Sequence, residues 1–570
     1  MNWLQRFSVS LLATAAIGGA AVSGAALSST AHAENLLILT EEVPVSLNYD
    51  GATASIDTNW VGWDNMLEPL VYHANGAINE DGVQLLDFNK FEGRLAESWS
   101  FDEATLTWTF NLRKGVMGCD GATFNADDVL YTFARAKSVS GSSPIGWFLA
   151  NTGSIDGFTP AVFAPTDDGA AARMLGDEVK KIDDYTVQIR QSAPNQLFLK
   201  VLSIFALYIF DKEIMEANAT EDDPWSHTYA NNVSIAGFGP YCLNEWRKGE
   251  SFSLTGNADY YRGAPVYDRV VVRKVPQSAN RVAILRSGGA QIAEHLTPKE
   301  YDNLSKADNV RVVGVQGNEN MFMILNFQNP PFDNPLVRQA IAHAIPYQKI
   351  IDTSYFGKAH KWAGVVPSTY PGFHVASTQY DYDPEKAKAL LAEAGYPGGA
   401  GLEAFSDVFK LTYILERESE VGPTATILHT AFRDVGINIE LNPIPQAQYG
   451  DRELVKKDLP MGLTAHIKPI GVDAAYGTLL SYVSANKGGI LNSANYSNDL
   501  VDGTLYGSLA EGDNDKRNEM LKIIQEQLMT DLAVIPILEF RTHWATAASV
   551  TGVVWHPDNA LRLYDLKPAN

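Results

Sequence analysis

Few residues in this chain have the types and spacing that catalysis or metal binding requires. Ser484 and Lys487 match the S-x-x-K pattern of penicillin-recognising enzymes, but the S-D-N and K-T-G partners of that pattern are missing from the sequence. The 11 histidines are scattered, and His343 has the setting of a packed residue on a helix face. No group of His, Asp and Glu has the spacing of a tight metal site. We therefore expect no catalytic site, no metal site and no cofactor.

Composition excludes several classes of protein. The chain has 570 residues, more than one hydrophobic core usually serves, so we expect at least two domains. The 67 acidic residues outnumber the 44 basic ones and give a net charge of −23. A nucleic-acid binder or a protein that docks on anionic lipid needs a basic face, so neither is expected.

The first 33 residues have the pattern of a signal peptide. Arg6 is followed by an apolar, small-residue run over residues 7–27, and Ala31 and Ala33 form an A-x-A cleavage site. The alternative is an uncleaved anchor, since the run is long enough to span a bilayer. We expect cleavage after Ala33 and no lipid or membrane anchor, which points to the periplasm or the outside of the cell.

The first half of the mature chain is rich in strand signals. Residues 35–40 predict a buried strand, and residues 97–112 predict a hairpin because apolar and polar residues alternate along them. Asn125 predicts the start of a helix, with two aspartates in its first turn. Residues 185–189 predict a further strand, and residues 239–275 a second hairpin-like region.

The second half alternates helices with strands. Asn334-Pro335 and Asp383-Pro384 predict helix starts, and further helices are expected over residues 423–435 and 514–529. Strands are expected over residues 437–441 and 533–538. This alternation favours an α/β fold with a mostly parallel sheet in this half.

Several segments together resemble bacterial extracellular solute-binding protein family 5, the peptide, opine and nickel ABC importers' binding proteins. The hairpin segment ends in Leu-Arg-Lys-Gly-Val, as the family's "LTYTFHLRKGV" block does, and Pro330-Pro331-Phe332-Asp333-Asn334 matches its "PPFDN". The matching blocks, in family order, cover residues 95–116, 120–136, 237–265, 326–345, 382–397 and 435–441.

The resemblance implies a two-lobed periplasmic binding protein fold, type II, in its large form. The expected domains are lobe I over residues 34–293, with an extra subdomain at about 75–215, lobe II over 294–534, and a return to lobe I over 535–570. The chain would cross outward near residues 291–295 and return near 534–537. A ligand cleft would lie between the lobes.

The family pattern also suggests ligand-binding residues. Trp60 and Trp63 offer flat apolar faces near the expected cleft, although core packing is the alternative for each. Asn318 and Asn320 precede a strand whose start faces the cleft in relatives. Dipeptide-binding relatives have, close to the position of Arg417, an arginine that binds the ligand carboxylate, so the resemblance suggests this role for Arg417. The alternative is that Arg417 is a solvated surface residue.

Residues 464–476 depart from the peptide binders. Those relatives carry an aspartate for the peptide's ammonium where this chain has Pro469 or Ile470, while His466 and Lys468 lie nearby and Asp473 matches a later acid. A buried ammonium without a carboxylate would be costly, which disfavours an ordinary peptide unless Asp473 or Glu319 takes the place of that aspartate. An acidic or polyhydroxyl solute is therefore at least as well suited as an ordinary peptide.

The resemblance implies a monomeric substrate-binding component of an ABC importer, not an enzyme, with a small solute and a membrane permease as partners. A secreted enzyme and a periplasmic sensor or chaperone on the same fold are the alternatives. Cys119 and Cys242, the two cysteines of an exported chain, are expected to form a disulfide within lobe I, the alternative being two buried thiols.

Overall fold

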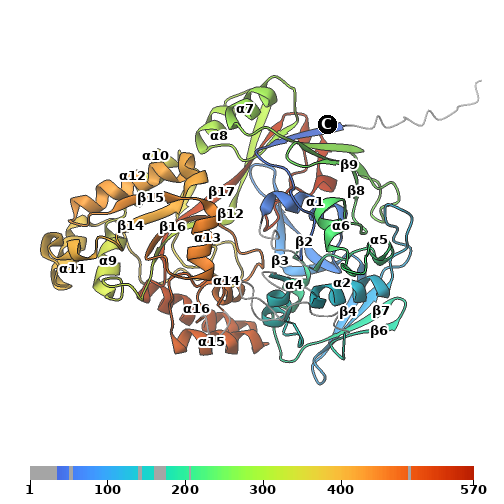
Figure 1. Ribbon diagram of the computed structural model, residues 1–570, viewed down its shortest axis with the longest axis horizontal. Helices are drawn as coiled ribbons and strands as arrows, with labels where there is room; N and C mark the ends of the chain where they lie inside the picture. The colour runs from blue at the N-terminus through green and yellow to red at the C-terminus, as the bar shows by residue number, and fades with distance from the viewer. Residues whose placement is uncertain are drawn as a thin grey trace, which may run out of the picture. The chain divides into compact units, whose positions relative to one another are not determined.

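Two long antiparallel strands form the middle of the computed structural model: β12 (Val310–Leu325) and β17 (Ile535–Ala547). The structure describes residues 35–50, 56–138, 144–158, 175–204, 207–484 and 489–569. Residues Glu34–Asn570 cluster as one unit. We call residues 35–309 and 548–569 lobe I and residues 326–534 lobe II; β12 and β17 run between them (Figure 1).

The main sheet continues into both lobes. On the lobe I side, β17 pairs with β11, followed by β1, β10, β9 and β8; on the lobe II side, β12 pairs with β16, followed by β14 and β15. The lobe I strands are β1 (Asn35–Thr40), β8 (Tyr241–Arg247), β9 (Ser251–Gly256), β10 (Arg269–Lys274) and β11 (Ile292–Ala293). The lobe II strands are β13 (Ala359–Lys361), β14 (Lys410–Ile414), β15 (Glu440–Ile444) and β16 (Met461–Ile467).

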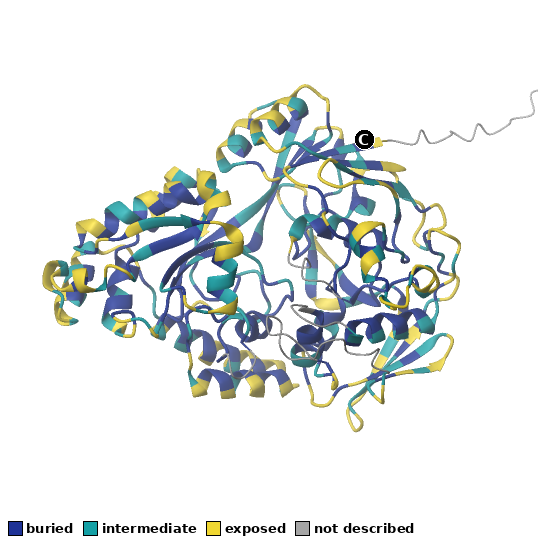
Figure 2. Cartoon of the chain, viewed as in Figure 1, coloured by how far each residue is buried: buried dark blue, intermediate teal, exposed yellow. Residues whose placement is uncertain are grey.

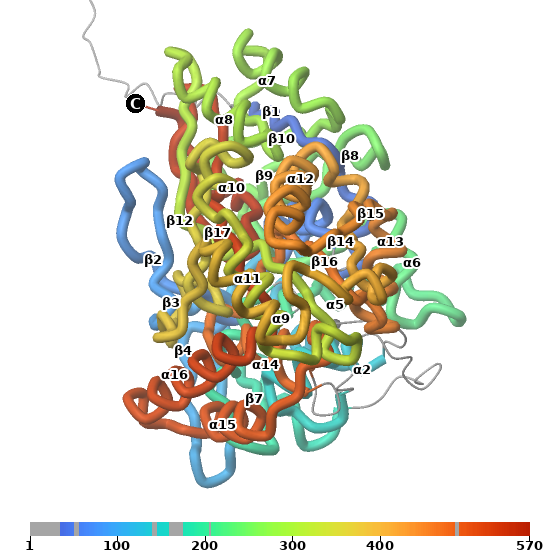
Figure 3. The backbone as a smooth tube through the Cα atoms, turned by 90° about the vertical axis from the view of Figure 1, so that its left-hand side faces the viewer, coloured from blue at the N-terminus to red at the C-terminus, as the bar shows by residue number. Residues whose placement is uncertain are grey.

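Lobe I carries further small sheets. Their strands are β2 (Val71–Ile78), β3 (Gln84–Gly93), β4 (Ala96–Asp102), β5 (Thr107–Leu112), β6 (Val179–Asp183), β7 (Thr186–Arg190), β18 (Val550–Thr551) and β19 (Lys567–Pro568). The β2–β3 hairpin lies beside β12 (Figure 3), where Asn79 donates a 2.8 Å hydrogen bond to the Gly314 carbonyl. This contact fastens lobe I to one of the two connecting strands.

Helices are distributed over both lobes. In lobe I they are η2 (Asp57–Asn59), α1 (Trp60–Met66), α2 (Ala126–Ser138), α3 (Pro144–Trp147), η3 (Phe148–Thr152), α4 (Phe198–Leu202), α5 (Lys212–Ala217), α6 (His227–Asn232), α7 (Ser278–Arg286) and α8 (Pro298–Leu304), with η10 (Leu563–Asp565) near the C-terminus. In lobe II they are α9 (Pro335–His343), α10 (Tyr347–Ser354), α11 (Pro384–Glu393), η5 (Pro397–Gly399), η6 (Leu402–Phe405), η7 (Leu415–Arg417), α12 (Glu418–Asp434), α13 (Gln446–Gly450), η8 (Asp451–Val455), α14 (Ala474–Ser481), α15 (Asp499–Ala510) and α16 (Asn514–Asp531).

Local sequence explains where several helices begin. The Asn334 side chain accepts a hydrogen bond from Leu336 N at the start of α9, and Pro335 occupies the first helical position. Asp383 caps α11 in the same way. Buried side chains fill the space between these helices and the sheet in each lobe, whereas the outer helix faces are exposed (Figure 2).

The structure corrects three expectations. The sheet formed by the second half of the chain is mixed rather than mostly parallel: β14 pairs in parallel with β15 and β16, but the connecting strand β12 pairs antiparallel with both β16 and β17. Helix α12 begins at Glu418 rather than at residue 423, and Pro423 lies inside the helix instead of at its start. The outward crossing is made by β12, later in the chain than expected; the exact domain boundaries stay predictions.

Cys119 and Cys242 are joined by a disulfide in lobe I, with their Cα atoms 5.7 Å apart. Among the residues described, no helix combines the length and the apolar character needed to cross a membrane. The predicted signal peptide lies outside those residues, as does Lys487 of the S-x-x-K match.

Candidate functional site

A charged cluster lies where β16 ends beside β12. The imidazole of His466 is held between two carboxylates: Nδ1 is 2.7 Å from Glu319 Oε2, and Nε2 is 2.6 Å from Glu420 Oε1. The ring also stacks on Phe540 of β17, with ring centroids 4.4 Å apart. Strand β12 supplies Glu319 and helix α12 supplies Glu420, so the cluster joins three elements of the chain.

The two glutamates determine the charge of His466. Burial lowers the pKa of an imidazole, but Glu420 and Glu319 outweigh burial and raise the pKa of His466 to about 9. Burial raises the pKa of Glu319, yet the His466 charge and hydrogen bond, together with Lys468, hold that pKa well below its usual range. The cluster is therefore an imidazolium between two ionised carboxylates at neutral pH.

Lys468 extends the cluster across to lobe I. Its Nζ lies 3.4 Å from Asp57 Oδ2 and 3.5 Å from Glu319 Oε1, and 4.9 Å from the centroid of the Trp60 ring. Asp57 and Trp60 belong to η2 and α1 of lobe I, while Lys468 follows β16 of lobe II. Charges from both lobes and from a connecting strand thus meet at one ammonium group.

Solvent still reaches this cluster. The exposed fractions of the Lys468, Glu319 and His466 side chains are 13%, 16% and 18%, and that of Asp57 is 43%. Arg417 is half-buried in η7. Burial raises the pKa of Asp57 and of Glu420, but Lys468 beside Asp57 and His466 beside Glu420, with a smaller contribution from Arg417 to both, hold these pKa values below their usual range. Alternating positive and negative groups, still accessible between two lobes, are suited to binding a polar or charged solute.

A second inter-lobe contact lies at Asp473. Lys200 of α4 places Nζ 2.5 Å from Asp473 Oδ2, and Arg517 of α16 places Nη2 2.7 Å from Oδ1. Asp473 also accepts a hydrogen bond from Ala475 N and so caps α14. Its carboxylate is buried and fully engaged, which makes it a contact that holds the lobes together in this conformation.

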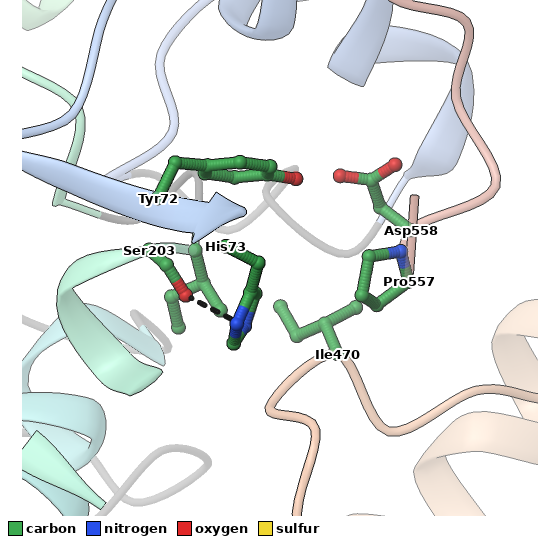
Figure 4. A pocket seen from close by; sticks show the side chains of 7 residues that line it. Tyr72, His73, Ser203, Ile470, Pro557 and Asp558 are labelled. Carbon is green, nitrogen blue, oxygen red and sulfur yellow. Dashed lines mark hydrogen bonds between the residues drawn. The ribbon is translucent and has the colours of Figure 1, made fainter. Parts of the chain in front are cut away.

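A small cavity of about 10 Å³ lies between the lobes (Figure 4). Its lining residues are Tyr72, His73, Ser203, Ile204, Ile470, Pro557 and Asp558. The Tyr72 hydroxyl and the Asp558 carboxylate point toward each other, and Ile470 of lobe II lies opposite His73 of lobe I. The cavity has room for one water molecule, so a larger group enters it only if the lobes move apart.

The other candidates from the sequence lie in different surroundings. Trp63 is fully buried in lobe I, where its indole donates to the Leu47 carbonyl at 2.7 Å. Asn318 is also buried and donates to Tyr370 Oη and to the carbonyls of residues 469 and 557. Asn320 is buried on β12. Of the eight predicted ligand residues, the structure brings Trp60, His466 and Lys468 together; a ligand role for any of the eight remains a prediction.

Sequence reasoning did not select Asp57 or Glu420 as site residues, and it named Glu319 only as a carboxylate that could take the place of the missing aspartate. Glu319 lies between Asn318 and Asn320, which were selected, so its position was within the right segment. Glu420 gave no signal, because only the packing of α12 against the end of β16 brings it to His466. In the parts of the chain that the structure describes, no three His, Cys, Asp or Glu side chains gather as metal ligands.

Comparison with known proteins shows to which family the chain belongs. The model of the bacterial extracellular solute-binding proteins, family 5, matches residues 90–489, which is more than half of the chain. The chain belongs to this family. Its relatives in family 5 are substrate-binding proteins of ABC transporters. These relatives are binding proteins rather than enzymes.

Relatives of this family 5 protein cover most of its length. It is 26% identical to the dipeptide-binding protein of Escherichia coli (strain K12) over 76% of this chain and 77% of that protein. It is also 26% identical to heme-binding protein A of Haemophilus influenzae, over 83% and 84% of the two chains.

A solved structure supports the fold. The ABC transporter-associated periplasmic binding protein DppA from Helicobacter pylori, in complex with peptide STSA, superposes with a TM-score of 0.76 at 24% identity, covering 94% of this chain and 98% of that one. The two-lobed periplasmic binding protein fold predicted from the sequence is confirmed.

Proposed function

We propose that the mature chain, cleaved after Ala33, works in the periplasm as a monomer that captures a small solute between its lobes and delivers it to an ABC permease. The observation that carries this proposal is the meeting of Asp57 and Trp60 from lobe I with Lys468 and Glu319 at a solvent-accessible point between the lobes. A solute that touches both lobes stabilises the conformation in which they are closed.

The chemistry of the cluster favours a polar or charged solute. The guanidinium of Arg417 suits a carboxylate, because two of its five N–H donors can point in parallel at the two carboxylate oxygens. The ionised carboxylates of Asp57 and Glu420 suit hydroxyl or N–H donors. Peptides, opines and other acidic or polyhydroxyl compounds carry such groups. The names of relatives, which include a dipeptide-binding and a heme-binding protein, support small solutes as a class.

The experiment starts from the protein itself. Mass spectrometry of compounds released by gentle denaturation identifies the solute, and calorimetry with that compound measures its affinity. We expect Lys468→Met to change the affinity at least tenfold, whereas Lys388→Met on the exposed face of α11 leaves it unchanged. Equal affinities for the wild type and both variants would place the solute elsewhere and contradict the proposal.

A further inference from the structure

The ammonium of Lys468 occupies surroundings that are typical of a site for a cationic ligand. It lies over the face of Trp60, with Asp57 and Glu319 carboxylate oxygens at 3.4 and 3.5 Å. An aromatic face attracts a cation through its quadrupole, and ionised carboxylates add charge-assisted hydrogen bonds. The chain's own lysine therefore takes the place that a ligand ammonium would take.

The groups around this ammonium are held in position by other contacts. Glu319 Oε2 is 2.7 Å from His466 Nδ1, and Glu319 Oε1 accepts a 2.9 Å hydrogen bond from Asn559 Nδ2. Trp60 of α1 is buried, with a relative exposure of 6%. The carboxylate and the ring therefore keep their places when the lysine side chain is removed, and the site is preorganised for another cation.

Lys468 and two of the groups around its ammonium come from different lobes. Lys468 belongs to lobe II, whereas Asp57 and Trp60 belong to lobe I, and Asp57 is 43% exposed toward solvent. A free cation in this place would bridge the same groups only if the lysine were absent. With the lysine present, a second ammonium would meet an equal charge a few ångströms away, which is strongly unfavourable.

We propose that Lys468 is a specificity-determining residue: a tethered cation that fills an ammonium subsite and so selects solutes that present a neutral or anionic group there. The inference rests on the proposed binding of a solute between the lobes. Its consequence is that shortening this one side chain converts the subsite into a binding site for alkylammonium ions.

The test uses n-propylammonium, whose three carbons and ammonium replace the Cγ, Cδ, Cε and Nζ atoms lost in Lys468→Ala. At constant ionic strength, millimolar n-propylammonium should raise the melting temperature of this variant saturably, by about 1–2 °C or more, because binding to the native state stabilises it. n-Propanol should not. The wild type, and Lys468→Met, in which the chain volume is filled without charge, should not respond to the amine.

The double variant Asp57→Asn, Lys468→Ala provides the second control, since it loses one carboxylate of the subsite and should lose most of the response. If Lys468→Ala does not fold, Lys468→Ser replaces it. No saturable response of the shortened variants, or an equal response of the wild type, would overturn the inference. The amine tests the subsite in the absence of the natural solute. The result therefore does not depend on whether that solute is identified or its binding is detected by calorimetry.

Discussion

The imidazolium of His466 should make the free energy of unfolding depend on pH. In the folded protein Glu319 and Glu420 raise the pKa of His466 to about 9, while an unfolded histidine has a pKa of about 6.5. The folded state thus binds the proton more tightly. This contribution to the free energy of unfolding is fully present below about pH 6.5 and is lost as the pH rises through about 9.

The magnitude follows from the difference between the two pKa values. One pKa unit corresponds to about 1.4 kcal/mol, so the cluster contributes up to about 3 kcal/mol at pH 6. Replacing His466 by Gln keeps a side chain of similar size but removes the proton. The wild type should therefore exceed His466→Gln in stability by about 3 kcal/mol more at pH 6 than at pH 9.5.

Urea denaturation of both proteins at several pH values measures this difference. His360→Gln provides the control, because His360 is exposed on β13 and, unlike His466, makes no ion pair with Glu319 or Glu420 in the described part of the chain. That variant should follow the wild type across the range. If the gap between wild type and His466→Gln were the same at pH 6 and pH 9.5, the charge assigned to the cluster would be wrong.

Three further outcomes are expected. Lys200→Met should lower the free energy of unfolding by about 1–3 kcal/mol, because Asp473 loses one of its two buried cationic partners; an unchanged urea midpoint would contradict this. The Cys119–Cys242 disulfide joins residues 123 positions apart, and its reduction should lower the free energy of unfolding by about 2–5 kcal/mol. The unfolded, unreduced protein should show no titratable thiol, and finding two thiols would contradict the disulfide. Arg417→Ala should weaken binding of an anionic solute by about 2–4 kcal/mol in calorimetry, and an affinity within twofold of the wild type would remove it from the site.

Local signals predicted much of the fold. The alternation along residues 97–112 corresponds to β4 and β5, and the Asn334-Pro335 pair starts α9 where expected. The errors lie where long-range packing decides. The mixed sheet arises because β12 and β17 run antiparallel between the lobes, a pairing that no local pattern encodes.

The candidate site shows the same division. Lys468 and His466 were selected because their segment departs from the peptide binders, and the structure places both at the cluster. Their partners Asp57 and Glu420 lie far away in the sequence, and acidic side chains of this kind are normally solvated. Only tertiary packing distinguishes these two carboxylates from the chain's other acids.

Small-angle scattering of the mature protein, with and without the solute identified by mass spectrometry, tests most directly whether the lobes close around a ligand. Inter-lobe contacts such as Lys468 with Asp57 and Lys200 with Asp473 belong to the closed arrangement. The account predicts a smaller radius of gyration at saturating solute than in its absence. An unchanged radius at saturation would contradict it.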